Sequence, residues 1–304
     1  MLFDCLEVQP KQSVLLVSDV KQTHAALAFL GVAAKAHVEM VSLSIPERPN
    51  SQPRLSPFFK NLIQTAELAI ILLPKLDSES LNWLRQQNRA HVILFPQVDD
   101  ETVLPSLETA QRPIRERCRK LADILTIGRN LQLGAANGTS LKMSMAHARG
   151  NAEVAPFLAE TFYAALPIGR AYLIPQIESV QGEIFLDSVA GQRGSTANIY
   201  LKIIDGRIKL IKGDKIAGSL RRQLRVHGGD ARQVVEIGFG LNDKARLGNS
   251  AFEDEKVLGT IHLGFGRLPS GSKIPEVFAR GILQAPTVTI DGKKIIEEGK
   301  VLVG

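Results

Sequence analysis

The sequence has few cysteines, few aromatic residues and no long uninterrupted hydrophobic run. Its two cysteines, Cys5 and Cys118, are too few and too far apart for a disulfide framework or a zinc knuckle. The longest aliphatic run, LAIILL at 68–73, is far shorter than the ~20 residues of a membrane helix. The N-terminus lacks a basic segment followed by a long apolar core, so no secretory signal is expected. These absences predict a soluble, cytoplasmic protein that does not bind membranes.

Positive charge is concentrated in the last two thirds of the chain. Residues 1–110 contain 9 Lys and Arg against 12 Asp and Glu, whereas residues 111–304 contain 28 against 19, a net charge of +9. This asymmetry is typical either of a basic face for an anionic partner or of two separately built domains. Composition alone does not decide between the two alternatives.

The first third of the chain alternates apolar runs with helical patterns, as parallel sheets with crossover helices do. The predicted strands are 13–19, 37–44, 68–74 and 91–97, and the predicted helices are 22–36 and 78–88. Ser78 is the expected N-cap of the second helix, and the proline-rich stretch from Pro46 to Pro57 is expected to be a loop. The turn VKQTH after the first strand contains no glycine, so the dinucleotide fingerprint GxGxxG is absent. Residues 1–110 are therefore predicted to form a Rossmann-like α/β domain.

A second domain, 111–304, is predicted after the acidic, proline-bounded segment 96–113. Its first helix, 114–127, places Ile114, Cys118, Leu121 and Leu125 on one stripe, so Cys118 is expected to be a small core residue. Short β-type runs follow from Leu131 onward. The pairs Asp205-Gly206 and Asp291-Gly292 each separate two such runs and predict hairpins. The second domain is therefore expected to be mixed and mainly β.

The most distinctive segment is 236–266, which reads EIGFGLNDKARLGNSAFEDEKVLGTIHLGFG. It resembles the signature block of the thermophilic-type metallo-aminopeptidases, the family that includes aminopeptidases T and S. The segments LPIGRAYLIPQIESVQGEIFLDS at 166–188 and ARGILQAPTVTIDGKKIIEEGKVL at 279–302 are similar to the same family. The resemblance implies an aminopeptidase T type of fold, a homodimer, and a chain truncated in its first domain relative to that family.

The resemblance also implies six metal-ligand positions, of which this chain keeps Glu236 and His262. The glutamate of the family's LPxGE segment falls on Arg170, since this chain reads LPIGR. Counting back from Pro286 puts the family's HxD pair at Phe278 and Arg280. The family's tyrosine ligand has no counterpart, because no tyrosine occurs in 201–304.

Two remaining donors do not make a metal site, because zinc needs at least three protein ligands and arginine does not deprotonate. A related enzyme on the same fold, 2,5-dihydroxypyridine dioxygenase, uses a histidine and the HxD pair for iron, and the same positions are changed here. The sequence thus predicts a degenerate metal site without metal or other cofactor. Part of the excess positive charge lies at Arg170 and Arg280.

Two arginines in an inherited pocket suggest that an anion is bound there. Arg170 and Arg280 are expected to grip a carboxylate, with Glu236 accepting from an amine or holding an arginine, and with His262 beside them. The leading hypothesis is a non-catalytic, peptide-binding pseudo-aminopeptidase whose ligand is a peptide or small carboxylate. Similar aminopeptidase-like proteins act as accessory proteins in ribosomal peptide natural-product pathways of the crocagin type.

Several alternatives stay open. In the first alternative, Glu236 and the arginines form only a salt bridge at a site that has lost its activity, and His262 is an ordinary core residue. Alternatively, the chain is an active hydrolase with an altered, metal-independent site, in which Glu236 is the base and His262 the acid. A third alternative is nucleic-acid binding through the basic second domain, which is disfavoured because only 5% of the residues are aromatic and stacking platforms are lacking.

Overall fold

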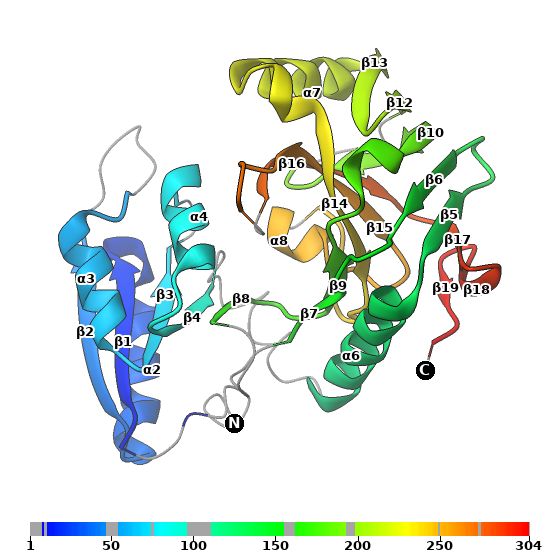
Figure 1. The fold of residues 1–304 in the computed structure, drawn as a ribbon. Coiled ribbons are helices and arrows are strands. Elements are labelled where there is room, and N and C mark those ends of the chain that lie inside the picture. Colours follow the sequence, from blue (N-terminus) through cyan, green and yellow to red (C-terminus); the bar gives the residue numbers. More distant parts are fainter. Residues whose placement is uncertain are drawn as a thin grey trace. The chain divides into compact units, whose positions relative to one another are not determined.

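The protein consists of two compact units (Figure 1). The computed structural model describes residues 8, 11–46, 54–73, 76–95, 111–154, 162–192, 198–248, 250–272 and 275–303. The first unit comprises Met1–Gln111 and Val154–Ile168, and the second comprises Arg112–Glu153 and Gly169–Gly304. A division close to residue 110 was expected from the sequence, but the return of Val154–Ile168 to the first unit was not.

The first unit contains a five-stranded parallel sheet in the order β2-β1-β3-β4-β8. The strands are β1 (Ser13–Asp19), β2 (Glu39–Ile45), β3 (Leu68–Leu72), β4 (His91–Leu94) and β8 (Tyr163–Ala165). Every residue of β3 is buried, which is typical of a central strand in a parallel sheet. This strand order is that of flavodoxin-type doubly wound sheets. The predicted Rossmann-like parallel-sheet domain is therefore confirmed.

Three α-helices are described in this unit: α2 (Thr23–Lys35), α3 (Pro57–Thr65) and α4 (Ser78–Gln86). The predicted N-cap of α4 is wrong, because Asp77 caps the helix by accepting a hydrogen bond from the backbone N–H of Ser80. Helix α3 was not predicted, since the preceding prolines indicated a loop. Pro57 lies in its first turn, where the missing N–H costs nothing, and Ser56 caps it by accepting from the N–H of Phe59.

The second unit is built on a curled, mainly antiparallel sheet of 14 strands. Its order is β11-β16-β15-β14-β13-β12-β10-β6-β5-β17-β18-β19; β9 pairs with β14 and β7 pairs with β9. The strands are β5 (Asn130–Gly134), β6 (Ser140–Ser144), β7 (Asn151–Glu153), β9 (Arg170–Leu173), β10 (Gln181–Leu186), β11 (Ser188–Val189), β12 (Ile199–Ile204), β13 (Arg207–Gly213), β14 (Gln233–Gly240), β15 (Ile261–Arg267), β16 (Glu276–Leu283), β17 (Thr287–Ile290), β18 (Lys293–Glu297) and β19 (Lys300–Val301). The predicted mainly β second domain is confirmed.

Both predicted hairpins form at the expected dipeptides. Asp205 and Gly206 join β12 to β13, and Asp291 and Gly292 join β17 to β18. All four residues have positive φ, at 50° and 68° in the first turn and 47° and 81° in the second. A two-residue turn needs this conformation to match the twist of its strands, and Asp-Gly adopts it readily.

The second unit contains the helices α6 (Gln111–Ile127), α7 (Lys215–Val226) and α8 (Ala251–Asp254). It also contains the short 3-10 helices η2 (Ile177–Ser179) and η3 (Gly229–Arg232), whereas η1 (Val20–Gln22) lies in the first unit. The predicted apolar stripe of α6 is confirmed, because Ile114, Cys118, Leu121 and Leu125 are all buried. Burial raises the pKa of Cys118 to about 12, which keeps its thiol protonated.

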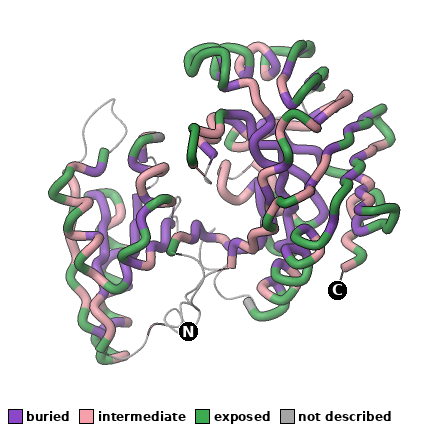
Figure 2. Tube along the Cα trace, in the orientation of Figure 1, coloured by how far each residue is buried: buried purple, intermediate pink, exposed green. Residues whose placement is uncertain are grey.

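Buried residues follow the strands of both units, whereas the helices expose one face (Figure 2). In the part of the chain that the structure describes, no helix is both long and apolar enough to cross a membrane. Residues 96–110 of the expected boundary segment 96–113 lie outside the described residues, as does Cys5, and residues 111–113 are the first residues of α6.

Candidate functional site

Seven titratable side chains from distant parts of the second unit meet in its interior. We call them the ion cluster: Glu153, Arg170, Glu236, Glu255, Lys256, His262 and Arg280. Six of these side chains are at most 7% exposed, and Arg280 is 11% exposed. The four site residues expected from the sequence, Arg170, Glu236, His262 and Arg280, are thus all brought together.

The strand register explains why these side chains meet. Glu153 and Arg170 are direct partners on β7 and β9, and Arg280 lies on β16 across Gly264 of β15 from Glu236 of β14. Residues that are direct partners on neighbouring strands have side chains on the same face of the sheet, and so do alternate residues along one strand. Glu236, Gly264 and Arg280 therefore share one face.

Two glycines make the room that the cluster needs. A Cβ on Gly238 would lie 2.1 Å from Nε2 of His262, and a Cβ on Gly264 would lie 2.8 Å from the Cβ of Glu236. Both positions face cluster residues on a neighbouring strand. The glycines of the IGFG and HLGFG segments therefore allow a histidine and a glutamate to fit between close strands.

Arg170 is at the centre of the cluster. Its Nε donates to Glu153, and its Nη1 lies 2.9 Å from Oε2 of Glu255 and 3.1 Å from Oε1 of Glu236. The guanidinium carbon also lies 4.4 Å from the ring centre of Tyr172. Burial opposes the charge, but the three carboxylates outweigh it and hold the pKa of Arg170 well above its ordinary value. Arg170 is therefore a permanent cation with internal partners.

Glu236 links the two arginines to the histidine. Its Oε1 accepts from Nε of Arg280 at 2.8 Å and from Nη1 of Arg170 at 3.1 Å, and it lies 3.5 Å from Nε2 of His262. Although burial acts in the opposite direction, Arg280 and Arg170 lower the pKa of Glu236 well below its ordinary value. Arg280 also contacts Oε1 of Glu255 through Nη1 at 3.2 Å. Glu236 is thus ionised and fully engaged.

Three members of the cluster were not predicted from the sequence: Glu153, Glu255 and Lys256. Nζ of Lys256 lies 3.1 Å from Oε2 of Glu153 and 3.7 Å from Oε2 of Glu255. Burial lowers the pKa of Lys256, although both carboxylates act against that shift. In isolation the run Glu253–Lys256 looks like a solvated turn. Its place inside the distinctive block at 236–266 is the one signal in the sequence from which Glu255 and Lys256 could have been predicted as part of the site.

His262 is fully buried and neutral, because burial lowers its pKa below the ordinary value. Its Nε2 lies 3.3 Å from Nη1 of Arg170 as well as near Glu236. Its Nδ1 has no hydrogen-bond partner among the described residues. A histidine that is merely part of the core normally satisfies both ring nitrogens. His262 is therefore held by the cluster at one nitrogen only.

The charges of the ion cluster cancel. Three carboxylates face three cations, and His262 is neutral, so burial of the group leaves no net charge. Removal of one partner from such a buried pair leaves an uncompensated charge and costs about 3–5 kcal/mol. The pairing itself therefore keeps the group together.

The residues of this site do not fit a metal ion. In the described parts of the chain, no group of three or more His, Cys, Asp and Glu side chains is arranged to hold a metal. The carboxylates of Glu236 and Glu255 are held by guanidinium groups instead. A divalent ion ~6 Å from one arginine would be repelled by about 5 kcal/mol at an effective dielectric constant of ~20.

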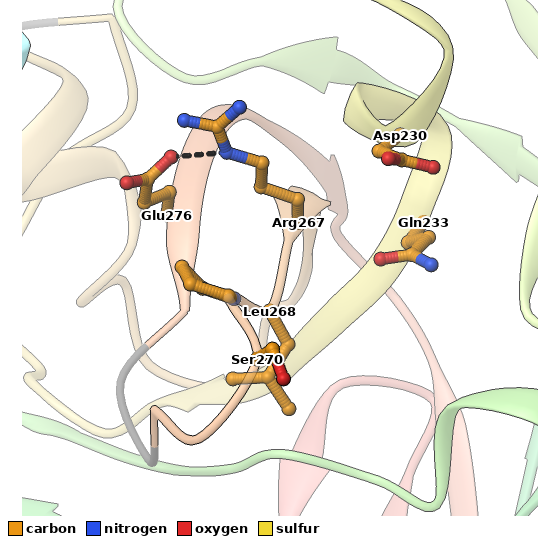
Figure 3. Close-up of a pocket in the computed structure, with 7 residues that line it drawn as sticks. Asp230, Gln233, Arg267, Leu268, Ser270 and Glu276 are labelled. Carbon is orange, nitrogen blue, oxygen red and sulfur yellow. Dashed lines mark hydrogen bonds and ion pairs between the residues drawn. The ribbon is translucent and has the colours of Figure 1, made fainter.

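Of the two residues expected at the HxD positions, only Arg280 belongs to the cluster. The ring of Phe278 stacks on His227 with a centroid distance of 4.0 Å and an interplanar angle of 4°. A separate hollow of about 370 Å³ lies at the far end of β15 and β16, where Arg267 and Glu276 form an ion pair (Figure 3). Its other lining residues are Asp230, Gln233, Leu268, Pro269 and Ser270.

The shifted pKa values predict that the protein loses stability as the pH falls. The folded-state pKa of His262 lies below 6.5, and those of Glu236 and Glu255 lie below 4.5, so the unfolded chain binds more protons at each group. The contribution of His262 is complete above pH 6.5 and is lost as the pH falls further; the glutamates lose theirs below pH 4.5. Urea titrations across this range measure the slope. In His262→Gln the slope between about pH 6.5 and 5 should decrease, and an unchanged slope would contradict the assignment.

The substitution Gly238→Ala should destabilise the protein. The new Cβ would lie 2.1 Å from Nε2 of His262 in a fully buried site, so the strands or the ring must shift. Overpacking of this kind costs about 1–3 kcal/mol of unfolding free energy, which urea denaturation measures. Gly229→Ala is the matched control, because nothing lies within 4 Å of a Cβ at that position. Equal effects of the two substitutions would show that the glycine does not accommodate His262.

Comparison with known proteins gives both a family and a fold. The sequence profile of the 2,5-dihydroxypyridine 5,6-dioxygenase family matches residues 2–265. No curated protein sequence matches the chain. The solved structure of 2,5-dihydroxypyridine dioxygenase from Pseudomonas putida superposes with a TM-score of 0.81 at 15% identity, covering 100% of this chain and 95% of that chain. AmpT from Thermus thermophilus superposes with a TM-score of 0.69 at 12% identity, covering 98% and 96%.

These findings confirm the aminopeptidase T type of fold and correct the functional hypothesis. The peptide-binding pseudo-aminopeptidase is wrong, because the matching family and a similar structure are dioxygenases. The hydrolase and nucleic-acid alternatives gain no support. The alignments cover 95% and 96% of the neighbouring chains, and the expected truncation of the first domain stays a prediction. The profile match spans most of the sequence, and the chain therefore belongs to the 2,5-dihydroxypyridine 5,6-dioxygenase family.

Proposed function

We propose that this chain is a metal-independent member of the dioxygenase family that binds a small anionic compound beside Arg280. The observation that carries the proposal is the charge-balanced ion cluster. Three cations hold the carboxylates that a metal would require, and each cation is tied to at least one carboxylate. Entry of a metal would require two arginines to give up buried ion pairs.

Arg280 is the member of the cluster that a ligand can reach. At 11% exposure its side chain is the most accessible of the seven. Its Nε and Nη2 donate to Glu236, and its Nη1 pairs with Glu255. A guanidinium has five N–H groups, so two remain for a ligand oxygen.

The family supports a small aromatic acid as the type of ligand. The matched profile and one similar structure carry the name of 2,5-dihydroxypyridine, a flat ring with two ionisable hydroxyl groups. A planar guanidinium suits such oxygens because it offers parallel N–H groups. The cluster is neutral overall, so binding depends on these directed hydrogen bonds rather than on a general attraction for anions.

A second candidate is the family reaction itself, oxygen-dependent opening of a dihydroxypyridine ring with a bound metal. Family membership and the superposition over the whole chain favour it. It requires that Arg170 and Arg280 leave Glu236, and that the freed donors then bind the metal. The two candidates differ in whether the purified chain uses iron.

Ring opening provides the first test. The purified chain is incubated aerobically with 2,5-dihydroxypyridine and ferrous iron, and oxygen uptake and loss of the ring's ultraviolet absorbance are followed. We expect no turnover above a protein-free control, because the cations exclude iron, and elemental analysis should find far less than one iron per chain. A family dioxygenase serves as the positive control. Sustained oxygen uptake that EDTA abolishes would establish the second candidate instead.

Binding at Arg280 provides the second test. Calorimetric titration with 2,5-dihydroxypyridine and with a pyridine carboxylate should detect binding to the wild-type chain. Arg280→Gln should weaken it about tenfold or more, because a hydrogen bond to a charged group contributes roughly 1.5–3 kcal/mol. Arg267→Gln is the matched control, since Arg267 is an exposed arginine paired with Glu276 outside the cluster. No binding by the wild type, or equal binding by Arg280→Gln, would refute the ligand site.

A further inference from the structure

We infer that the carboxylates of Glu236 and Glu255 form a binding site for a planar cation of charge +1. In the folded protein the guanidinium of Arg280 occupies this site. When the Arg280 side chain is shortened, the same site should take up a free guanidinium-type cation. The inference deepens the proposed function, because it rests on the metal independence of the cluster.

The contacts of Arg280 outline the site. Nε lies 2.8 Å from Oε1 of Glu236, Nη2 lies 3.4 Å from Oε2 of the same carboxylate, and Nη1 lies 3.2 Å from Oε1 of Glu255. The two carboxylates come from β14 and from the segment after α8, so the guanidinium joins two separate parts of the second unit. All three nitrogens take part, as in a complex of a carboxylate pair with a free guanidinium ion.

The charge balance of the cluster determines which charge a cation must carry to replace the Arg280 side chain. Without Arg280 the cluster contains three carboxylates and two cations, Arg170 and Lys256, and so carries a net charge of −1. One positive charge restores neutrality. A divalent ion would leave the buried group at +1 and would lie close to Arg170, whose Nη1 is only 3.1 Å from Oε1 of Glu236. The site therefore favours an organic monovalent cation over a metal.

The space and its access also fit this ligand. Arg280 is the most exposed member of the cluster, at 11%, so of the seven side chains its position is the most accessible from solvent. The facing residue on β15 is Gly264, which has no side chain to fill that space. The two carboxylates remain fixed, because Arg170 contacts both of them. A cation can therefore enter a site whose acceptors are already placed.

Chemical rescue of Arg280→Ser tests the inference. We expect this variant to have a lower Tm than the wild type, and methylguanidinium at about ten times its Kd to raise that Tm by roughly 3 °C. The wild type and Arg267→Ser should show no such rise. Co²⁺ should neither raise the Tm of Arg280→Ser nor produce a visible absorption band. The inference is overturned if methylguanidinium fails to stabilise the folded variant, or if Co²⁺ stabilises it instead.

A double variant keeps the test decisive if Arg280→Ser does not fold. In Arg280→Ser with Glu236→Gln, one negative and one positive charge are removed together, so the cluster stays neutral. This variant should be more stable than Arg280→Ser and should not respond to methylguanidinium. If it is less stable than the single variant, Arg280 does not balance Glu236, and the inference fails. Iron-dependent turnover by the wild type would refute the proposed function separately.

Discussion

The second unit depends on the neutrality of its ion cluster around Glu236. Six buried charges would each cost several kcal/mol if they were left unpaired in the interior. They are tolerated because every carboxylate contacts at least two cationic groups: Arg170 and Lys256 at Glu153, Arg170 and Arg280 at Glu236, and all three cations at Glu255. The ends of β7 and β9, the middle of β14 to β16 and the segment after α8 must therefore stay in register for any one of the charges to remain buried.

Local patterns allowed the first unit to be predicted closely, because each of its elements is encoded over a short stretch. The strand β1 has the bounds that its apolar run predicted. The strand β8 was missed because it joins the sheet from Val154–Ile168, after a whole helix and three strands of the other unit. Helix α7 was not predicted from the sequence. Asp214 as N-cap and the buried spacing of Ala217, Leu220 and Leu224 were the signals that its many arginines obscured.

The site was predicted only in part, for a related reason. Arg170, Glu236, His262 and Arg280 were found because each lies at a position that a family motif uses. Their partners are not encoded by spacing: Glu153 lies 17 residues from Arg170 in the sequence, and Glu255 lies 85 residues from it. The sequence therefore suggested two arginines that await an external carboxylate, whereas the fold supplies carboxylates to both from within. For Arg170 all described ion pairs are internal; only Arg280 keeps a partly exposed face.

This internal pairing also changes the meaning of the net charge of +9 in residues 111–304. Glu153, Glu236 and Glu255 neutralise Arg170, Arg280 and Lys256, so the cluster contributes nothing to the excess. Among the described residues, part of the excess lies on the surface, at Arg221, Arg222 and Arg225 on the exposed side of α7. Charge on the surface attracts or repels ligands and partner molecules as they approach the protein. The paired charges of the buried cluster instead determine which ions could replace one of its members. A chain can therefore keep the fold of a structure to which it is only 15% identical while the charges at the centre of its second unit are paired among its own side chains.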